Sequence, residues 1–423
     1  MQRRLTRLAP FAFICALIIA VLALGSSAGA ATTPNDPQFP SQWALAKVRA
    51  PQAWDVTRGN TAVKVALVDT GIRVLPDLVG QVGTGINEIT PGGSTDDTYG
   101  SYGLGTGVAG TMGAATNNSR DVAGVNWNIT MLPVKVCDFT AGCPTAAIAA
   151  GINWAVANGA QIINITPSLT ASTPDIDSAV ANAIARGILV VAAAGDNASQ
   201  TYYPAANPGV IAVGATDQND VIATFSGKHP TLVAPGQMVN VLVTGGCCRQ
   251  STGTAFAAGH VSGALALLLS AGVPAATAKT AVLQGAQDLG AAGWDSTYGY
   301  GRLDICGALA RAGIACPTGA ATSTPTATAT SVPPTTATAA PPTATSTPVP
   351  ATATPTRTNT PVPPTATPTP SAPTPTKTPV PPTATSTLTP PTATWTPTPA
   401  AAISSPTATP TWCPRGHAKR GRC

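Results

Sequence analysis

The chain has 423 residues, with 22 Lys or Arg, 17 Asp or Glu and three His, which gives a formal net charge of +5. Much of the basic excess lies near the two ends, so the composition gives little support to nucleic-acid binding, and we expect no such partner. Only 9% of the residues are charged and 42 are proline, many of them in a C-terminal region that cannot bury a core. The composition therefore predicts a globular part followed by a low-complexity segment.

The N-terminal 30 residues have the pattern of a secretory signal peptide. Arg3, Arg4 and Arg7 precede the apolar stretch 11–24, and Ala28-Gly29-Ala30 forms a small-residue cleavage site. A membrane anchor is the other interpretation, but the apolar stretch is short for crossing a bilayer. We therefore expect residues 1–30 to be removed. The mature chain is then secreted or held at the cell surface, with no membrane span.

Residues 31–316 are expected to form one α/β domain. Five apolar runs predict buried strands, three segments between them have helical patterns, and a further apolar run at 261–269 predicts a buried helix. The strands are expected at 63–70, 129–136, 161–166, 188–195 and 209–216, and the helices between them at 106–115, 145–158 and 174–186. This alternation indicates a parallel, doubly wound sheet, on which ligands bind at the carboxyl ends of the strands. Asp69, which ends the first strand, is therefore a candidate functional carboxylate.

Eight of the nine cysteines follow the signal peptide, and they lie in four local pairs. Local pairs suit an oxidising compartment, so disulfides are expected at Cys137–Cys143, Cys306–Cys316 and Cys413–Cys423. Cys247 and Cys248 either join each other or pair elsewhere. No C-x-x-C motif is present, which argues against structural zinc.

Residues 317–411 consist almost entirely of Thr, Pro, Ala and Ser. This composition predicts a disordered, extended stalk that is a candidate for O-glycosylation. The following residues, 412–423, form a short basic tail that a Cys413–Cys423 bond would close. The tail is either a contact for an anionic cell-envelope polymer or a solubilising terminus.

Several motifs in the globular part share their order and spacing with one known family. They include KVRAPQAWDVTRG (47–59), VALVDTGI (65–72), GTGVAGTMGAATNNS (105–119), VVAAAGDN (190–197) and GTAFAAGHVSG (253–263). In these residues the chain resembles the subtilisin family of serine proteases, and its thermitase-like members in particular. The resemblance covers nearly the whole domain and implies a three-layer α/β/α sandwich with a mainly parallel sheet. It also implies peptide-bond hydrolysis by an Asp, a His and a Ser.

The catalytic positions that this resemblance implies are only partly retained. Asp69 matches the family's aspartate, but Leu104 stands at the histidine position and Ala255 at the serine position. Asp196 replaces the asparagine that donates to the oxyanion, and an ionised carboxylate would repel that charge. His260 matches a structural histidine of the family, and the other two histidines lie far from these motifs. We therefore expect no acyl-enzyme chemistry.

The resemblance also implies a structural calcium ion. Carboxylates would come from Asp36 and Asp77, a side-chain oxygen from Asn118, and carbonyl oxygens from Ala115, Arg120 and Val122. Hard oxygen ligands from separate chain segments suit Ca²⁺. The other interpretation is that Asp36 and Asp77 are solvated turn residues.

The peptide-binding groove that the resemblance implies is altered on both sides. One edge corresponds to residues 138–144 and the other to Thr166-Pro167-Ser168, where proline cannot donate a ladder hydrogen bond. Three functions remain open at this point. The first is an inactive, secreted subtilisin-like protein that acts as a binding or structural module, with an unknown protein or peptide ligand. The second is a calcium-stabilised serine-type endopeptidase with a rewired site, and the third places the function in the stalk and tail.

Overall fold

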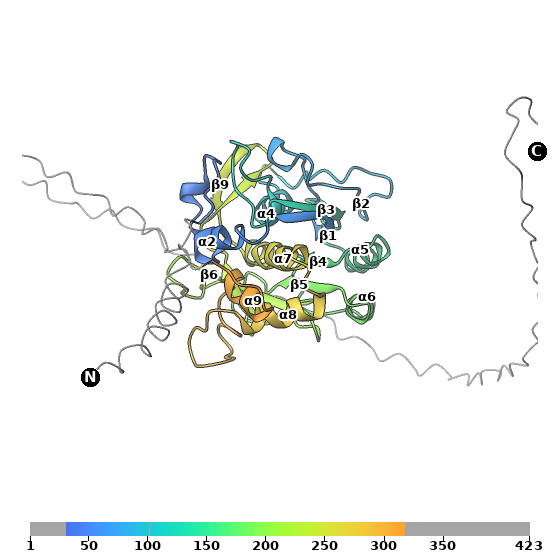
Figure 1. The fold of residues 1–423 in the computed structure, drawn as a ribbon. Helices are drawn as coiled ribbons and strands as arrows, with labels where there is room; N and C mark the ends of the chain where they lie inside the picture. Colours follow the sequence, from blue (N-terminus) through green and yellow to red (C-terminus); the bar gives the residue numbers. More distant parts are fainter. Residues whose placement is uncertain (1–30, 101, 318–423) are drawn as a thin grey trace, which may run out of the picture. The chain divides into compact units, whose positions relative to one another are not determined.

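Seven parallel strands form the central sheet of the computed structural model, which describes residues 31–100 and 102–317 (Figure 1). The strand order is β2-β3-β1-β4-β5-β6-β7. The strands are β1 (Gly59–Asp69), β2 (Ile86–Asn87), β3 (Asn128–Lys135), β4 (Ile162–Ile165), β5 (Leu189–Ala193), β6 (Ile211–Thr216) and β7 (Leu232–Pro235). Each of the five predicted strands is present, and the parallel sheet is confirmed.

Both faces of the sheet are buried, which explains the continuous apolar runs in the sequence. Along β1, Val65 and Leu67 belong to one core cluster, whereas Ala66 and Val68 belong to a second cluster on the opposite face. Successive side chains of a strand point to opposite faces, so a strand between two helical layers must be apolar at every position.

Helices cover both faces, and the three-layer α/β/α sandwich is confirmed (Figure 1). The first face carries the short helices η1 (Phe39–Ser41), α2 (Trp43–Lys47), α3 (Ala50–Ala53) and η2 (Pro76–Leu78), and the longer helices α4 (Leu104–Gly113), α7 (Thr254–Ser270), α8 (Ala275–Gln284) and α9 (Ile305–Arg311). The second face carries α5 (Thr145–Ala157) and α6 (Pro174–Ala185). Helix α7 is buried on all sides from Thr254 to Leu268, as expected for the middle of a layer.

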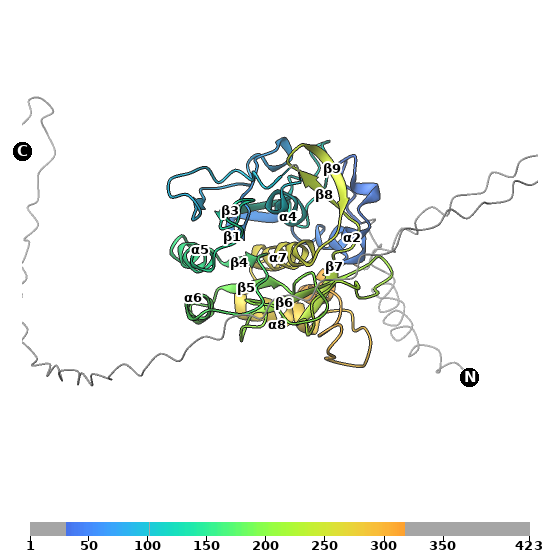
Figure 2. The same cartoon turned by 180° about the vertical axis from the view of Figure 1, so that it is seen from behind.

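A separate antiparallel hairpin, β8 (Val239–Val243) and β9 (Gly246–Ser251), lies against α4 (Figure 2). The sequence did not predict this hairpin, nor β2, β7, α8 and α9. Helix α4 also begins two residues before its predicted start and ends two residues before its predicted end. The early start is explained by its cap, which comes from Asp97 in the loop that leads into the helix.

Three disulfides join residues that are close in the chain. They are Cys137–Cys143, Cys247–Cys248 and Cys306–Cys316, with Cα–Cα distances of 4.2, 3.7 and 5.3 Å. The first and third are predicted pairs, and the second is one of the two arrangements considered for its cysteines. The predicted signal peptide, the stalk beyond residue 317, the basic tail and the Cys413–Cys423 pair lie outside the described residues. Within the described part of the chain, none of the helices combines the length and apolar character that a membrane crossing requires.

Candidate functional site

The fold brings the three catalytic positions together at the carboxyl ends of the strands, as the sequence predicts. Asp69 is the last residue of β1, and the first turn of α4 lies against it. Gly105 in that turn is so close that a Cβ atom added to it would lie 3.2 Å from Asp69 Cγ. The first turn of α7 packs on α4 in turn, and a Cβ on Gly107 would stand 3.1 Å from Phe256 Cε1. Asp69, Leu104 and Ala255 thus come from elements that meet at one place.

Asp69 is a buried carboxylate, and only one of its two oxygens accepts a hydrogen bond from a described residue. Its Oδ1 accepts a hydrogen bond of 2.6 Å from the Thr70 amide, whereas Oδ2 is buried and has no partner in the described part of the chain. Burial away from water raises the pKa of Asp69 from 3.8 to about 7. An imidazole beside it would favour the charged form, but no histidine supplies one here.

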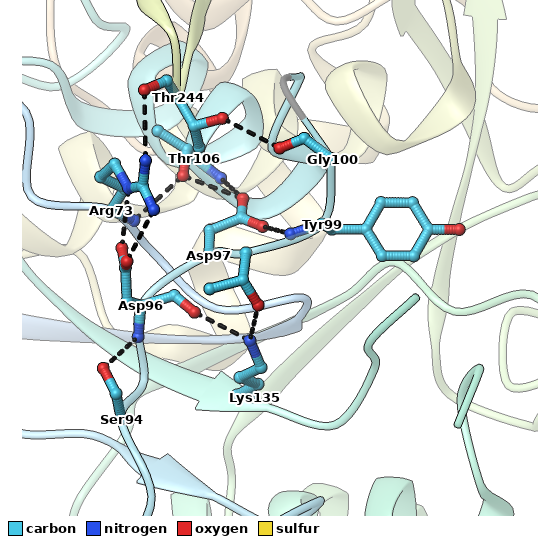
Figure 3. A network of polar contacts seen from close by, with 10 residues as sticks. Arg73, Ser94, Asp96, Asp97, Tyr99, Gly100, Thr106, Lys135 and Thr244 are labelled. Carbon is cyan, nitrogen blue, oxygen red and sulfur yellow. Dashed lines mark hydrogen bonds and ion pairs between the residues drawn. The ribbon is translucent and has the colours of Figure 1, made fainter. Parts of the chain in front are cut away.

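Leu104 begins α4 and is half-buried against the core cluster that contains Ala255. The helix has Gly103 at its N-cap and therefore no capping side chain of its own. The buried Asp97 caps it instead, because Oδ2 accepts from both the Thr106 amide and the Thr106 hydroxyl at 2.9 Å (Figure 3). Asp97 was not among the residues predicted from the sequence. The feature that could have indicated it is a helix start that has no capping side chain of its own.

A polar network continues from Asp97 into the preceding loop (Figure 3). Arg73 forms a two-pronged ion pair with Asp96, with N–O distances of 3.0 and 2.8 Å. The buried Lys135, at the end of β3, donates to the Asp96 carbonyl at 2.8 Å and to Thr98 Oγ1 at 3.0 Å. These contacts hold the loop and the start of α4 in place.

At the N-terminus of α7, where the family resemblance places the nucleophile, the side chains form structural hydrogen bonds. Asp196, which follows β5 by three residues, accepts at Oδ1 from the Thr254 amide at 2.8 Å and from the Thr254 hydroxyl at 2.7 Å. The same hydroxyl accepts from the Gly195 amide at 3.1 Å, so Thr254 is fully engaged. Ala255 follows with a buried methyl group. Asp196 therefore places an anion at the N-terminus of α7, where a helix dipole favours it.

Neither histidine in the described residues is placed to act as a base. His260 is buried inside α7, where Nδ1 lies 2.9 Å from the Phe256 carbonyl oxygen. Burial lowers the pKa of His260 from 6.5 to about 4, so this histidine is neutral at ordinary pH. His229 lies on an exposed loop.

The two segments expected to form the edges of a peptide groove are already hydrogen-bonded within the molecule. Asp138 and Gly142 exchange two backbone hydrogen bonds of 2.9 and 3.1 Å inside the loop closed by Cys137–Cys143. On the other side, the Thr166 amide donates to the Val68 carbonyl at 3.2 Å, and Pro167 has no amide hydrogen. Leu169, the residue after this segment, exchanges two backbone hydrogen bonds with Tyr203. A peptide adding as a strand would find few free backbone donors here.

The residues expected to bind calcium are assembled at one place. Both Asp36 and Asp77 are buried, and neither forms an ion pair with a described residue. Asp36 accepts from the amides of Asn117 and Asn118 at 2.7 and 3.2 Å, and Asp77 accepts from the Val122 amide at 3.1 Å. The loop therefore folds around two carboxylates that have no cationic side chain to balance them.

The electrostatics and the free oxygens of this loop fit a cation. The pKa of Asp77 is raised to about 6, mainly by burial and in smaller part by the negative charges of Asp121 and Asp36, whereas hydrogen bonds from Asn118 and the Val122 amide act to lower it. Among the described residues, nothing donates to the carbonyl oxygens of Ala115, Arg120 and Val122. These are the carbonyls that the sequence assigned as ligands.

Asn118 differs from its expected role in one respect. Its Nδ2 donates to Asp77 at 2.8 Å, and its Oδ1 accepts from the Arg120 amide at 2.9 Å. The nitrogen thus faces the carboxylate, because an amide beside an unbalanced anion turns its donor toward it. Half a turn of the amide would present the oxygen to a cation.

The fold defines the class of the protein: an α/β/α sandwich of the serine-protease type, in which Asp69, Leu104 and Ala255 come from elements that meet at the carboxyl ends of the strands. Residues 60–301 match the model of the subtilase family, and the chain belongs to that family. It is 38% identical to thermitase of Thermoactinomyces vulgaris over 260 residues, which cover 59% of this chain and 90% of that protein. It is 36% identical over 283 residues to the thermophilic serine proteinase of Bacillus sp. (strain AK1), covering 65% of this chain and 69% of that protein. Subtilisin Savinase of Lederbergia lenta is 38% identical over 229 residues, covering 53% of this chain and 83% of that protein.

Proposed function

We propose that this subtilase-family protein does not hydrolyse peptides and acts outside the cell as a binding or structural module. The observation that carries the proposal is the buried Asp69 Oδ2, which has no hydrogen-bond partner among the described residues. In an active triad this carboxylate orients the imidazole. In this chain Leu104 stands at the position of the histidine and Ala255 at the position of the serine nucleophile.

The size of the loss supports this proposal. In subtilisin, removal of the serine or the histidine alone lowers turnover by about 2 × 10⁶. Loss of a side-chain donor to the oxyanion costs about 10²–10³. This chain lacks all three groups, and Asp196 at the donor position is bound to Thr254.

The alternative, an endopeptidase with a rewired site, requires another nucleophile with a base beside it. Beside Ala255, the Thr254 hydroxyl lies 2.7 Å from Asp196 Oδ1, but that carboxylate also accepts from the Thr254 amide, and the hydroxyl accepts from the Gly195 amide, so both groups are engaged in capping α7. A second pair is Thr98 with Lys135, whose Nζ lies 3.0 Å from Thr98 Oγ1. That Nζ also donates to the Asp96 carbonyl oxygen at 2.8 Å, so its hydrogen bonds tie the loop of residues 96–98 to the end of β3. The pair therefore favours a structural role.

We also propose that a calcium ion binds at the loop of residues 115–122. Asp36 and Asp77 would supply carboxylate oxygens, Asn118 its amide oxygen, and Ala115, Arg120 and Val122 their carbonyl oxygens. The ion would balance the two buried carboxylates and tie the N-terminal segment to the loop. This role is structural and independent of hydrolysis.

We infer that the protein is secreted, from the signal-peptide pattern of residues 1–30. Residues 317–411 would act as a stalk, and the basic tail 412–423 would contact an anionic envelope polymer. A chain ending at Cys316 tests this assignment, because it should lose binding to the native cell surface if the tail carries that contact.

The test of inactivity compares the mature protein with the triple variant Leu104→His/Ala255→Ser/Asp196→Asn on casein, in the presence of calcium. We expect no hydrolysis by the natural chain. Activity in the triple variant, lost again on adding Asp69→Asn, would mean that the fold and the peptide groove persist and that the natural chain lacks only the catalytic side chains. Lys135→Met in the natural chain is the control for the rewired site. Hydrolysis by the natural chain that survives repurification and scales with its concentration would contradict the proposal.

A further inference from the structure

A cavity of about 310 Å³ lies among the residues that follow β6 and β7, and residues of α2 and β9 complete its lining. It is lined by one indole ring (Trp43), one carboxylate (Asp217), Met238 and four side-chain amides (Gln218, Asn219, Gln237 and Gln250). Asp69, Leu104, Asp196 and Ala255 do not line it. Its volume lies at the lower end of the range for small-molecule sites, about 300–1,000 Å³.

The four amides are free to bind a ligand. Within residues 31–100 and 102–317, none of these four side chains forms a hydrogen bond, although many other amides of the chain do. Each carboxamide offers two donors and one acceptor oxygen. A sugar hydroxyl is also both donor and acceptor, so neighbouring hydroxyls can pair with both ends of an amide.

The indole ring is held in a fixed orientation. Trp43 Nε1 donates to the Met238 carbonyl at 3.0 Å, and the Met238 amide donates to Thr252 Oγ1 at 3.0 Å. Met238 has a φ of 55°, which is uncommon for a residue other than glycine. Such backbone outliers gather at binding sites, where the surrounding structure must hold them.

The turn that contains the lining residue Asp217 is also held in place by hydrogen bonds. Asp217 Oδ1 accepts from the amides of Asn219 and Val221 at 2.8 and 2.9 Å, which closes a tight turn. The next residue, Asp220, has a φ of 66° and is held by ion pairs to Lys47 and Arg302. A site whose walls are already ordered loses little entropy when a ligand binds.

The charge of the lining selects among ligand classes. Asp217 is its one charged residue, so phosphate and carboxylate ligands find no cation to pair with. The Lys47 ammonium group is already paired with Asp220, and the guanidinium of Arg249, next in the chain to the lining residue Gln250, stacks on the Tyr102 ring. An indole ring with free amides and no cation suits an uncharged ligand that has both C–H faces and hydroxyl groups.

We propose that this cavity binds a neutral saccharide, with a sugar ring against Trp43 and its hydroxyls on Asn219, Gln237 and their neighbouring amides. The site shares no residue with the degenerate centre. It therefore stands whether or not the protein hydrolyses peptides.

The experiment presents the full mature chain to an immobilised panel of neutral oligosaccharides built from glucose, galactose, mannose and N-acetylglucosamine, with sialylated and sulfated glycans and a peptide library beside it. The best neutral glycan is then titrated calorimetrically against Trp43→Ala, Asn219→Ala and Trp294→Ala. Trp294 is an exposed tryptophan outside the cavity and serves as the matched control. Thermal unfolding of each variant checks its fold, and the exposed Asn219 is the variant least able to disturb it.

We expect a neutral glycan to bind, with a loss of about tenfold or more in Trp43→Ala, about three- to tenfold in Asn219→Ala and no change in Trp294→Ala. Three results would overturn the proposal: no binding of any neutral glycan, binding of charged glycans or peptides only, or neutral-glycan binding that both cavity variants leave unchanged. The casein assay is separate, so failure of this site and failure of the proposed inactivity are distinguishable.

Discussion

Replacement of Asp69 by Asn should stabilise the folded protein at pH 8, although Asp69 lies at the centre of the site. In the folded chain its Oδ2 is buried without a partner, and burial raises its pKa from 3.8 to about 7. Above pH 7 the folded protein therefore carries a buried charge that the unfolded chain solvates freely. An asparagine of nearly the same shape removes that charge and keeps an acceptor for the Thr70 amide.

The magnitude follows from the pKa difference. A rise of about three pKa units corresponds to about 4 kcal/mol of destabilisation above pH 7, at 1.36 kcal/mol per unit. The new amide nitrogen would lie at the unpartnered Oδ2 position, and a buried unsatisfied donor costs about 1–3 kcal/mol. The expected net gain at pH 8 is therefore about 1–3 kcal/mol in the free energy of unfolding.

The sign of the pH dependence is also determined. Because the folded-state pKa lies above the unfolded-state value, the folded protein binds the proton more tightly. This contribution makes the natural chain less stable as the pH rises from about 4 to about 7, and constant above that. The advantage of Asp69→Asn should therefore shrink as the pH falls from 7 toward 4.

Urea unfolding of the mature chain at pH 4.5, 6, 7 and 8, with disulfides intact and calcium constant, measures this effect. Asp97→Asn is the matched control, because this other buried carboxylate accepts from the Tyr99 amide, the Thr106 amide and the Thr106 hydroxyl. The control should destabilise at every pH. A loss of stability in Asp69→Asn at pH 8, or a gain that does not change between pH 5 and 8, would refute the reasoning.

Three further predictions concern the same domain. Removal of calcium by EDTA should lower Tm by about 5–10 °C, as expected for an ion present at about 100 times its Kd. The variant Asp77→Asn should no longer respond to EDTA, whereas the control variant Asp288→Asn, at an exposed position, should respond as the natural chain does. Asp196→Ala should lower the free energy of unfolding in urea by about 1 kcal/mol, because the cap on Thr254 is lost, whereas Asp196→Asn keeps the acceptor and should cost less. The pKa of His260 is lowered to about 4, so its contribution to stability is present above pH 6.5 and lost as the pH falls from 6.5 to 4. His260→Gln should flatten that part of the stability profile, and an unchanged profile would contradict the assignment.

Features that depend on short stretches of the chain were predictable from the sequence. The strands at 63–70 and 188–195 are apolar in their central residues, 65–68 and 189–193, because both faces of the sheet are covered, and the structure contains them as β1 and β5. The absence of a histidine at Leu104 and of a serine at Ala255 is a property of residue identity and needed no coordinates. Short local disulfides such as Cys137–Cys143 were predictable for the same reason.

Features that depend on contacts between distant segments were not predictable. Asp196 caps α7 across a separation of 58 residues. The loop that precedes α4 folds back so that Asp97, nine residues before Thr106, caps that helix. The sequence indicated that Asp196 stands where the family has an oxyanion donor, but only the structure shows that its carboxylate accepts hydrogen bonds from Thr254. The two-residue strand β2 exists because β3 lies beside it, and no pattern of two residues predicts a strand.

The sequence by itself determined the family, the layered fold and which residues stand at positions 69, 104, 196 and 255, because these follow from residue identity, motif order and the period of apolar residues. Tertiary structure alone decided how the inherited site is now used: Asp69 keeps a buried oxygen without a partner, and Asp196 stabilises a helix. It also placed Trp43 beside amides that lie about 175 to 200 residues away in the chain. Hydrogen bonds, burial and cavities depend on which distant side chains meet, and a linear pattern does not contain that information.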